Sequence, residues 1–159
     1  MIRVLMVCTG NICRSPMAEG LLRSRLERAG LAGRVAVDSA GTTDYHSGEP
    51  PDRRAQQAAR ARGVEIADQR ARRVTAADLD RFDYLLTMDE SHVQYLHRLA
   101  TDDAQRARIQ PLMSFAPDWP VREVPDPYYG GSRGFAQVMD MLEAAVEGLL
   151  ARLREQLPD

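Results

Sequence analysis

The sequence predicts an α/β protein, with a parallel β-sheet that is covered by helices on both faces. Short apolar runs that suit strands alternate along the chain with segments of helical periodicity, and this alternation is typical of parallel sheets. The chain has 159 residues, of which 44% are hydrophobic and 28% are charged, and this balance is typical of globular proteins. We therefore expect residues 1–159 to form a single domain with one core.

The expected strands are apolar or β-branched runs that end in polar or turn-forming residues. They lie at residues 2–7, 34–39, 83–88 and 109–113, the last being the shortest. The expected helices carry their apolar residues on one face. They lie at residues 16–30 and 52–62, from Asp89 onward, and at residues 135–157. Pro16 suits a first helical turn and Gly63 a helix end, whereas residues 114–132 are rich in Pro and Gly and predict a long loop.

Composition and charge exclude several functional classes. The formal net charge is −2, which does not favour nucleic acid or an anionic membrane as the main partner. The arginine-rich stretch at residues 53–73 is expected to be mainly a solvated helix face, with binding of acidic phosphopeptides as the alternative. Two cysteines are too few for a disulfide framework, and no cluster of metal ligands stands out. No apolar run suits a signal peptide or a membrane span, so we expect a cytoplasmic protein.

The chemistry is concentrated in residues 8–15, CTGNICRS, between the first strand and the first helix. Ligands of parallel sheets bind beyond the carboxyl ends of the strands, and a helix N-terminus adds positive potential there. This potential favours the thiolate of Cys8, and the planar guanidinium of Arg14 can hold two phosphate oxygens. Gly10 permits a tight turn, Asn11 tolerates a left-handed conformation, and Ser15 can donate a hydrogen bond to the thiolate. The pattern predicts a loop that holds a phosphate group beside a nucleophilic cysteine.

A single cysteine after a strand is more often a small core residue than a nucleophile. Here five residues separate Cys8 from Arg14, and the Gly, Asn and Ser residues of the segment stand where such a loop needs them. The whole arrangement therefore favours a phosphate-binding site with a nucleophilic Cys8 over a cysteine that only packs in the core.

The chain resembles the low-molecular-weight protein tyrosine phosphatases. The segment VCTGNICRSPMAEG at residues 7–20 is similar to their N-terminal signature. Further similar segments follow in the same order: DSAGT at 38–42, GEPPD at 48–52, FDYLLTMDESH at 82–92 and VPDPYYGG at 124–131. The resemblance spans nearly the whole chain. It implies a four-stranded parallel sheet with the phosphate-binding loop after the first strand, no metal, no cofactor, and hydrolysis of phosphotyrosine.

The resemblance also implies a role for each matching residue. Cys8 is expected to attack phosphorus and form a cysteinyl-phosphate, while Asp126 protonates the leaving oxygen and later activates water. Arg14 and the loop hold the phosphate. The residues expected to contact the substrate are Thr9, Gly10, Asn11, Ile12, Cys13, Ser15, Tyr45, Tyr128 and Tyr129. The three tyrosines would form aromatic walls, with ordinary surface packing as the alternative.

Two further residues are expected to stabilise the loop without contacting the substrate. Ser39 resembles a serine of the family that braces Asn11. Gln69 stands where relatives often carry a histidine that ties the loop together, and its amide can still form hydrogen bonds.

Three rival functions remain open. A protein-arginine phosphatase is the nearest one, and its relatives carry Thr at the position of Ile12, whose apolar side chain favours a phenyl ring over a guanidinium. An arsenate reductase would need cysteines after Cys13, and the chain has none there. A non-catalytic phosphate-binding module would not need Cys8, Arg14 and Asp126 together. The expected partner is a tyrosine-phosphorylated protein, together with a cognate tyrosine kinase, and we expect a monomer or a weak homodimer.

Overall fold

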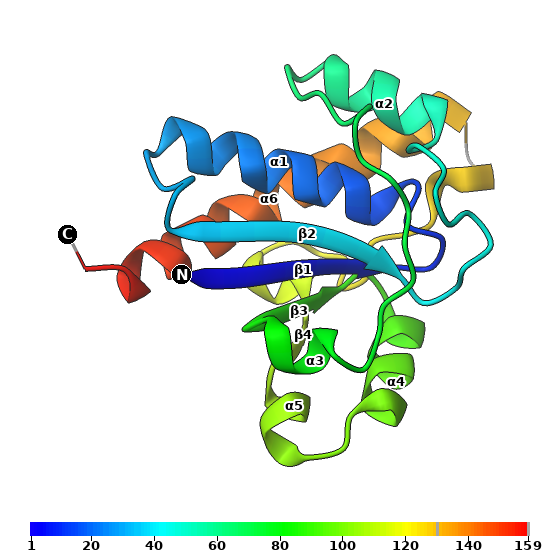
Figure 1. Ribbon diagram of the computed structural model, residues 1–159. Helices are drawn as coiled ribbons and strands as arrows, with labels where there is room; N and C mark the ends of the chain where they lie inside the picture. The colour runs from blue at the N-terminus through cyan, green and yellow to red at the C-terminus, as the bar shows by residue number, and fades with distance from the viewer. Residues whose placement is uncertain (130, 159) are drawn as a thin grey trace.

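The structure is a computed structural model that describes residues 1–129 and 131–158, except for the side chains of residues 129 and 132. Four parallel strands form one sheet in the order β2-β1-β3-β4, which confirms the predicted parallel sheet (Figure 1). The strands are β1 (Ile2–Cys8), β2 (Val35–Gly41), β3 (Tyr84–Thr87) and β4 (Ile109–Pro111). The order places β1 in the interior of the sheet, so that the loop after it is flanked by both neighbouring strands.

Six α-helices connect and cover the strands in the described part of the chain. They are α1 (Arg14–Arg28), α2 (Arg53–Arg60), α3 (Asp78–Arg81), α4 (Glu90–Leu99), α5 (Asp103–Ala107) and α6 (Gly131–Gln156). Two short 3-10 helices lie at Leu112–Phe115 and Pro127–Tyr129. The sequence did not predict α3 and α5, since helices this short carry too few apolar residues to show a period. The expected strand at 109–113 ends early, because Leu112 already begins a 3-10 helix.

Successive residues of β1 face opposite sides of the sheet and enter two separate cores. Val4 and Met6 belong to the larger core, which includes apolar residues of α1 and α6. Leu5 and Val7 belong to the smaller one, which includes residues of α3 and α4. All four side chains are fully buried. Figure 1 shows α1 and α6 on one side of the sheet and α3, α4 and α5 on the other, as the prediction of helices on both faces requires.

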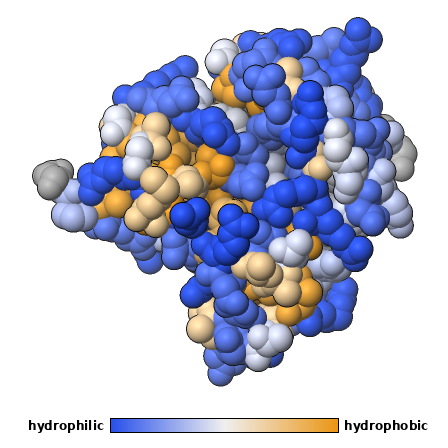
Figure 2. Space-filling view, viewed as in Figure 1, coloured by the Kyte–Doolittle hydropathy of each residue, from blue (hydrophilic) through white to orange (hydrophobic). Residues whose placement is uncertain are grey.

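The visible surface is mostly hydrophilic, with separate hydrophobic patches (Figure 2). Within the residues that the structure describes, no helix combines the length and the apolar character that crossing a membrane requires.

The carboxyl ends of the strands provide the space for the loop at residues 8–15. Cys8 ends β1 and lies beside Gly41, the last residue of β2. A Cβ atom at position 41 would lie 2.6 Å from the carbonyl oxygen of Thr9 and 3.1 Å from the backbone nitrogen of Asn11. Only glycine therefore allows the loop to pack this closely on the end of β2.

Candidate active site

Cys8 lies at the bottom of the loop, where β1 ends. Its side chain is only 2% exposed, and its Sγ lies 2.9 Å from Oγ of Ser15 in the first turn of α1. The loop runs directly from β1 into α1, which begins at Arg14. The unpaired backbone N–H groups of that helix start are therefore available to an anion near the sulfur.

Asn11 holds the loop in shape. It has a φ of 57°, in the left-handed region that asparagine tolerates better than most residues. Its Nδ2 donates to Oγ of Ser15 at 2.8 Å and to Oγ of Ser39 at 2.9 Å, and its Oδ1 accepts from the backbone N–H of Arg72 at 3.0 Å. Because Ser15 Oγ accepts from Asn11, its own hydrogen is available for Cys8 Sγ.

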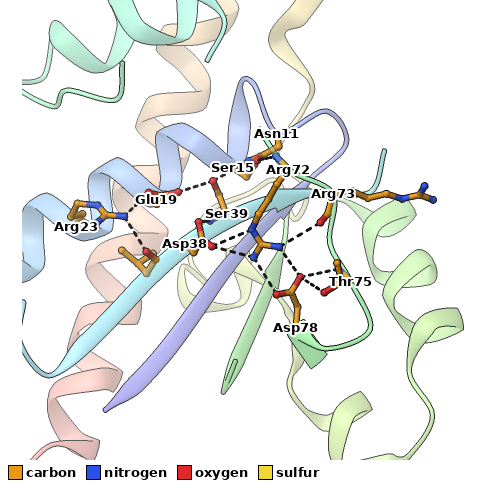
Figure 3. A network of polar contacts seen from close by, with 11 residues as sticks. Asn11, Ser15, Glu19, Arg23, Asp38, Ser39, Arg72, Arg73, Thr75 and Asp78 are labelled. Carbon is orange, nitrogen blue, oxygen red and sulfur yellow. Dashed lines mark hydrogen bonds and ion pairs between the residues drawn. The ribbon is translucent and has the colours of Figure 1, made fainter. Parts of the chain in front are cut away.

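A chain of polar contacts continues from Asn11 into the body of the protein (Figure 3). Ser39 Oγ donates to Oε1 of the buried Glu19 at 2.7 Å, and Arg23 pairs with the other carboxylate oxygen. Burial raises the pKa of Glu19, although the hydrogen bonds from Ser39 and Arg23 oppose that rise. Ser39 thus contacts Asn11 on one side and a buried carboxylate on the other.

Arg72 does not behave as a solvated helix residue, contrary to the expectation for the arginine-rich stretch. Its guanidinium pairs with Asp78 at 2.9 Å and with Asp38 at 3.1 Å, and the three residues lie in the network of Figure 3. Both carboxylates are anchored on elements beside the loop, since Asp38 is part of β2 and Asp78 begins α3. These two ion pairs hold Arg72 in place, and the backbone N–H of Arg72 donates to Asn11.

Arg14 is also buried, with 2% of its surface exposed. Its guanidinium donates hydrogen bonds to several groups of the protein. Its Nη1 donates to Oδ2 of Asp89 at 2.7 Å and to the carbonyl oxygen of Val124 at 3.0 Å. Its Nη2 donates to Oγ1 of Thr9 at 3.3 Å and lies 3.8 Å from Oδ2 of Asp126. The guanidinium is therefore held at a defined angle before any ligand enters.

Asp89 and His92 are two site residues that the sequence analysis did not single out. Asp89 caps α4, and His92 completes a capping box by accepting from the backbone N–H of Asp89. Burial opposes ionisation of Asp89, but hydrogen bonds from Ser91 and Arg14 hold its pKa below the usual value. Burial lowers the pKa of His92 to about 4, despite the nearby carboxylate of Asp89. An Asp-x-x-His pattern at an expected helix start could have indicated them. Residues three positions apart lie on the same side of a helix turn, so both side chains can face the loop.

The loop forms the bottom of a cleft of about 230 Å³. The residues that line it are Cys8, Thr9, Gly10, Ile12, Cys13, Arg14, Thr43, Tyr45, His46, Asp126 and Tyr128. The cleft thus brings together most of the residues singled out from the sequence. Asn11, Ser15 and Ser39 lie behind it as buried supports, and the side chain of Tyr129 lies outside the described residues. Thr43 and His46 are lining residues that were not among those expected to contact the substrate.

The upper part of the cleft is exposed. The side chain of Asp126 is 48% exposed, and Tyr45 is 82% exposed. Tyr128 is held from two sides: its backbone N–H donates to Oδ1 of Asp126 at 3.0 Å, and the guanidinium of Arg54 lies 5.1 Å from its ring centre. Arg54 is in turn paired with Asp52. The segment that carries Asp126 is therefore tied to α2.

Ile12 and Cys13 lie at the boundary between the cleft and the core. Both line the cleft, yet both are mostly buried and belong to the larger core. Burial, together with the carboxylate of Asp52, raises the pKa of Cys13, which keeps this thiol neutral. Gln69 donates from Nε2 to the carbonyl oxygen of Pro16 at 3.0 Å. Gln69 thus supports the first turn of α1, directly after the loop.

Taken together, a thiol at the end of β1, a buried guanidinium and a carboxyl group face one cleft. No cluster of metal-ligating side chains occurs within residues 1–129 and 131–158. An α/β sheet with an anion-binding loop that carries a cysteine and an arginine defines the class of cysteine-dependent phosphate-binding proteins.

Comparisons with known proteins place the chain within that class. The family model described as low molecular weight phosphotyrosine protein phosphatase matches residues 3–159. A relative from Streptomyces coelicolor, named low molecular weight protein-tyrosine-phosphatase, is 44% identical and covers 98% of this chain and 95% of its own. The chain belongs to the family of low molecular weight phosphotyrosine protein phosphatases.

Solved structures agree with this result. The crystal structure of YfkJ from Bacillus subtilis has a TM-score of 0.93 and 38% sequence identity, and the match covers 99% of this chain and 98% of that one. A protein tyrosine phosphatase from Entamoeba histolytica, crystallised with Hepes in its active site, has a TM-score of 0.93 and 36% identity. That match covers 98% of this chain and 99% of the other.

Proposed function

We propose that this protein hydrolyses phosphotyrosine in proteins, and simple aryl phosphates, through a cysteinyl-phosphate intermediate. The observation that carries the proposal is that Cys8, Arg14 and Asp126 line one cleft, with Oδ2 of Asp126 only 3.8 Å from Nη2 of Arg14. A phosphate on the guanidinium would therefore lie within reach of both the sulfur and the carboxyl group. Relatives that are 38% to 44% identical over nearly the full chain are named protein-tyrosine-phosphatases, which supports the same activity.

In the first step, the Cys8 thiolate forms a bond to phosphorus while the bond from phosphorus to the phenolic oxygen breaks. Asp126 gives its proton to that leaving oxygen. Arg14 and the backbone N–H groups of the loop hold the charge on the remaining phosphoryl oxygens. The products are a free tyrosine hydroxyl and a cysteinyl-phosphate.

In the second step, the Asp126 carboxylate takes a proton from water as the water oxygen bonds to phosphorus. The bond between sulfur and phosphorus breaks, and the thiolate returns to the 2.9 Å contact with Ser15. A hydrogen bond from Ser15 stabilises the departing thiolate. Inorganic phosphate leaves, and Asp126 is again protonated.

The shape of the cleft favours an aromatic phosphate ester. Cys8 lies at its buried end, whereas Tyr45 and Tyr128 lie at its exposed end, so that a long flat side chain can reach the sulfur while contacting aromatic rings. Ile12 adds an apolar surface that offers no partner to a guanidinium, which disfavours phosphoarginine. The natural partner would be a tyrosine-phosphorylated protein and, upstream of it, a tyrosine kinase.

Hydrolysis of a simple aryl phosphate tests the activity directly. We expect turnover by the wild type and none by Cys8→Ser, with inorganic phosphate as a competitive inhibitor. Matched phosphotyrosine, phosphoserine and phosphoarginine peptides test the substrate class. Binding of phosphate without turnover would instead support the non-catalytic alternative.

A further inference from the structure

The contacts of His92 define which ring nitrogen carries its proton. Nδ1 lies 3.1 Å from the backbone N–H of Asp89 and 3.3 Å from that of Met88, so Nδ1 is an acceptor and has no hydrogen. The ring is fully buried. In the neutral imidazole the proton therefore lies on Nε2, which donates to Oγ1 of Thr9 at 2.9 Å.

Thr9 consequently receives two hydrogen bonds. The second comes from Nη2 of Arg14, at 3.3 Å from the same Oγ1 atom. A hydroxyl oxygen has two lone pairs and one hydrogen, so both acceptor positions of Thr9 are occupied and only its hydrogen is left. Within residues 1–129 and 131–158, the hydrogen bonds of Oγ1 are those with His92 and Arg14, and Thr9 lines the same cleft as Cys8.

We propose that the Thr9 hydroxyl donates a hydrogen bond to a phosphoryl oxygen of the substrate, and that His92 is the positioning residue that turns the hydroxyl in this direction. The inference rests on the proposed function, because it assumes that a phosphate occupies the loop. It adds a side-chain donor to the backbone N–H groups and Arg14. His92 itself does not touch the substrate, since its two ring nitrogens are already engaged within the protein.

The position of His92 explains why its effect would depend on Thr9. The capping box of α4 sets the ring orientation, and the ring then sets the direction of a hydroxyl at the end of β1, the strand that lies beside β3. Without the donor on Nε2, one lone pair of Oγ1 is free, and the hydroxyl can turn its hydrogen away from the cleft. The loss on changing His92 should therefore be no larger than the loss on removing the Thr9 hydroxyl, and the two losses should not add.

The experiment is a double-mutant cycle with four variants: Thr9→Val, Thr9→Ser, His92→Gln and the double variant Thr9→Val/His92→Gln. His97→Gln is the matched control, because His97 lies on the same helix and is exposed. For each protein, kcat and KM on an aryl phosphate, the inhibition constant of inorganic phosphate and the thermal unfolding midpoint are measured. Thr9→Val keeps the shape of the side chain and removes the donor, whereas Thr9→Ser keeps the donor.

We expect Thr9→Val to lower kcat/KM about 10- to 100-fold, the range for a hydrogen bond to a charged group, and to weaken phosphate inhibition. Thr9→Ser should stay close to wild type. His92→Gln should fall between these two, because the amide of glutamine can replace the ring contacts in part, and the double variant should match Thr9→Val alone. His97→Gln should change neither kinetic constant.

Three outcomes would overturn the inference. One is an unchanged kcat/KM and phosphate inhibition in Thr9→Val. Another is a loss in the double variant that equals the product of the two single losses, since His92 would then act by a separate route. The third is a drop in unfolding midpoint for His92→Gln without any change in phosphate inhibition. If the wild type shows no turnover, the proposed function fails, and titration calorimetry with inorganic phosphate on the same variants still decides whether Thr9 and His92 hold the anion.

Discussion

The floor and the mouth of the cleft are built differently. The floor, residues 8–15, is mostly buried: Cys8, Asn11 and Arg14 are each 2% exposed and each is held by side chains from other elements. The mouth, which consists of Tyr45, Asp126 and Tyr128, is open to solvent, with exposures from 38% to 82%. The floor is thus organised before a ligand arrives, while the mouth has room to receive one.

This difference corresponds to two tasks. Stabilising a phosphoryl group that changes its bonding requires donors at set positions, which do not need to reorganise during the reaction. Accepting a protein side chain and exchanging protons with it and with water requires access. We therefore expect the loss of Cys8 or Arg14 in the floor to abolish hydrolysis, and changes in the mouth to reduce or redirect it.

The largest effect is expected in the floor. Cys8→Ser should abolish hydrolysis but retain binding of inorganic phosphate, because the loop and Arg14 form the anion site without the sulfur. Arg14→Lys should also be inactive, since an ammonium cannot reproduce the contacts to Asp89, Val124 and Thr9 together with a two-pronged grip on phosphate. Steady-state kinetics and calorimetric titration with phosphate provide the two measurements. Retention of about a tenth of the wild-type rate by Cys8→Ser would refute the nucleophile assignment.

At the mouth, Asp126→Asn should lower kcat by about 10²- to 10⁴-fold, as expected for a lost general acid. The loss should shrink with aryl phosphates whose leaving group is already acidic, because these need less protonation. Asp118→Asn is a matched control, since Asp118 lies in the same long loop but outside the cleft. The basic limb of the pH profile should disappear in Asp126→Asn, and a limb that stays unchanged would rule out this role.

The buried His92 behind the floor should make stability depend on pH. Its pKa is lowered from 6.5 to about 4 by burial, so between these values the unfolded chain binds a proton that the folded chain does not. Above pH 6.5 the titration of His92 costs no stability. As the pH falls from 6.5 towards 4, the free energy of unfolding decreases by about 3 kcal/mol because of His92.

Urea unfolding of wild type and His92→Gln at about pH 7 and pH 4.5 measures this term. The variant should show a smaller decrease in unfolding free energy between the two pH values, whereas His97→Gln should follow the wild type. Equal decreases in all three proteins would mean that His92 ionises normally in the folded state.

The smallest expected effect concerns the choice of substrate by Ile12, a floor residue whose side chain also lines the cleft. Ile12→Thr should shift the ratio of kcat/KM for phosphoarginine over phosphotyrosine peptides upward by roughly 10-fold, since a hydroxyl can meet a guanidinium that an apolar side chain leaves unpaired. Ile12 is mostly buried in the larger core, so unfolding midpoints must be compared in parallel. A ratio that does not move, or a wild type that prefers phosphoarginine, would show that Ile12 is not the selector.

Much of this organisation could be predicted because it depends on local patterns. Residues 8–15 combine a strand end, a helix start and the residue types that an anion loop needs, all within eight consecutive positions. The parallel sheet followed from the alternation of strands and helices, and the structure confirms it. By contrast, α3 and α5 are too short to produce a period, and residues 112–113 continue as a 3-10 helix where a strand was expected.

The sequence by itself determined the anion loop, the alternating architecture and the residues that carry the proposed chemistry, because each depends on neighbours in the chain. Only the tertiary structure decided which distant residues hold the loop. Asp89 and His92 reach Arg14 and Thr9 because β3 lies beside β1, and Arg72 reaches Asn11 because its segment crosses the end of β2. These contacts join residues 61 to 83 positions apart, and a pairing over such a separation leaves no periodic trace in the sequence. It is set by strand order, which depends on the packing of both cores around the sheet.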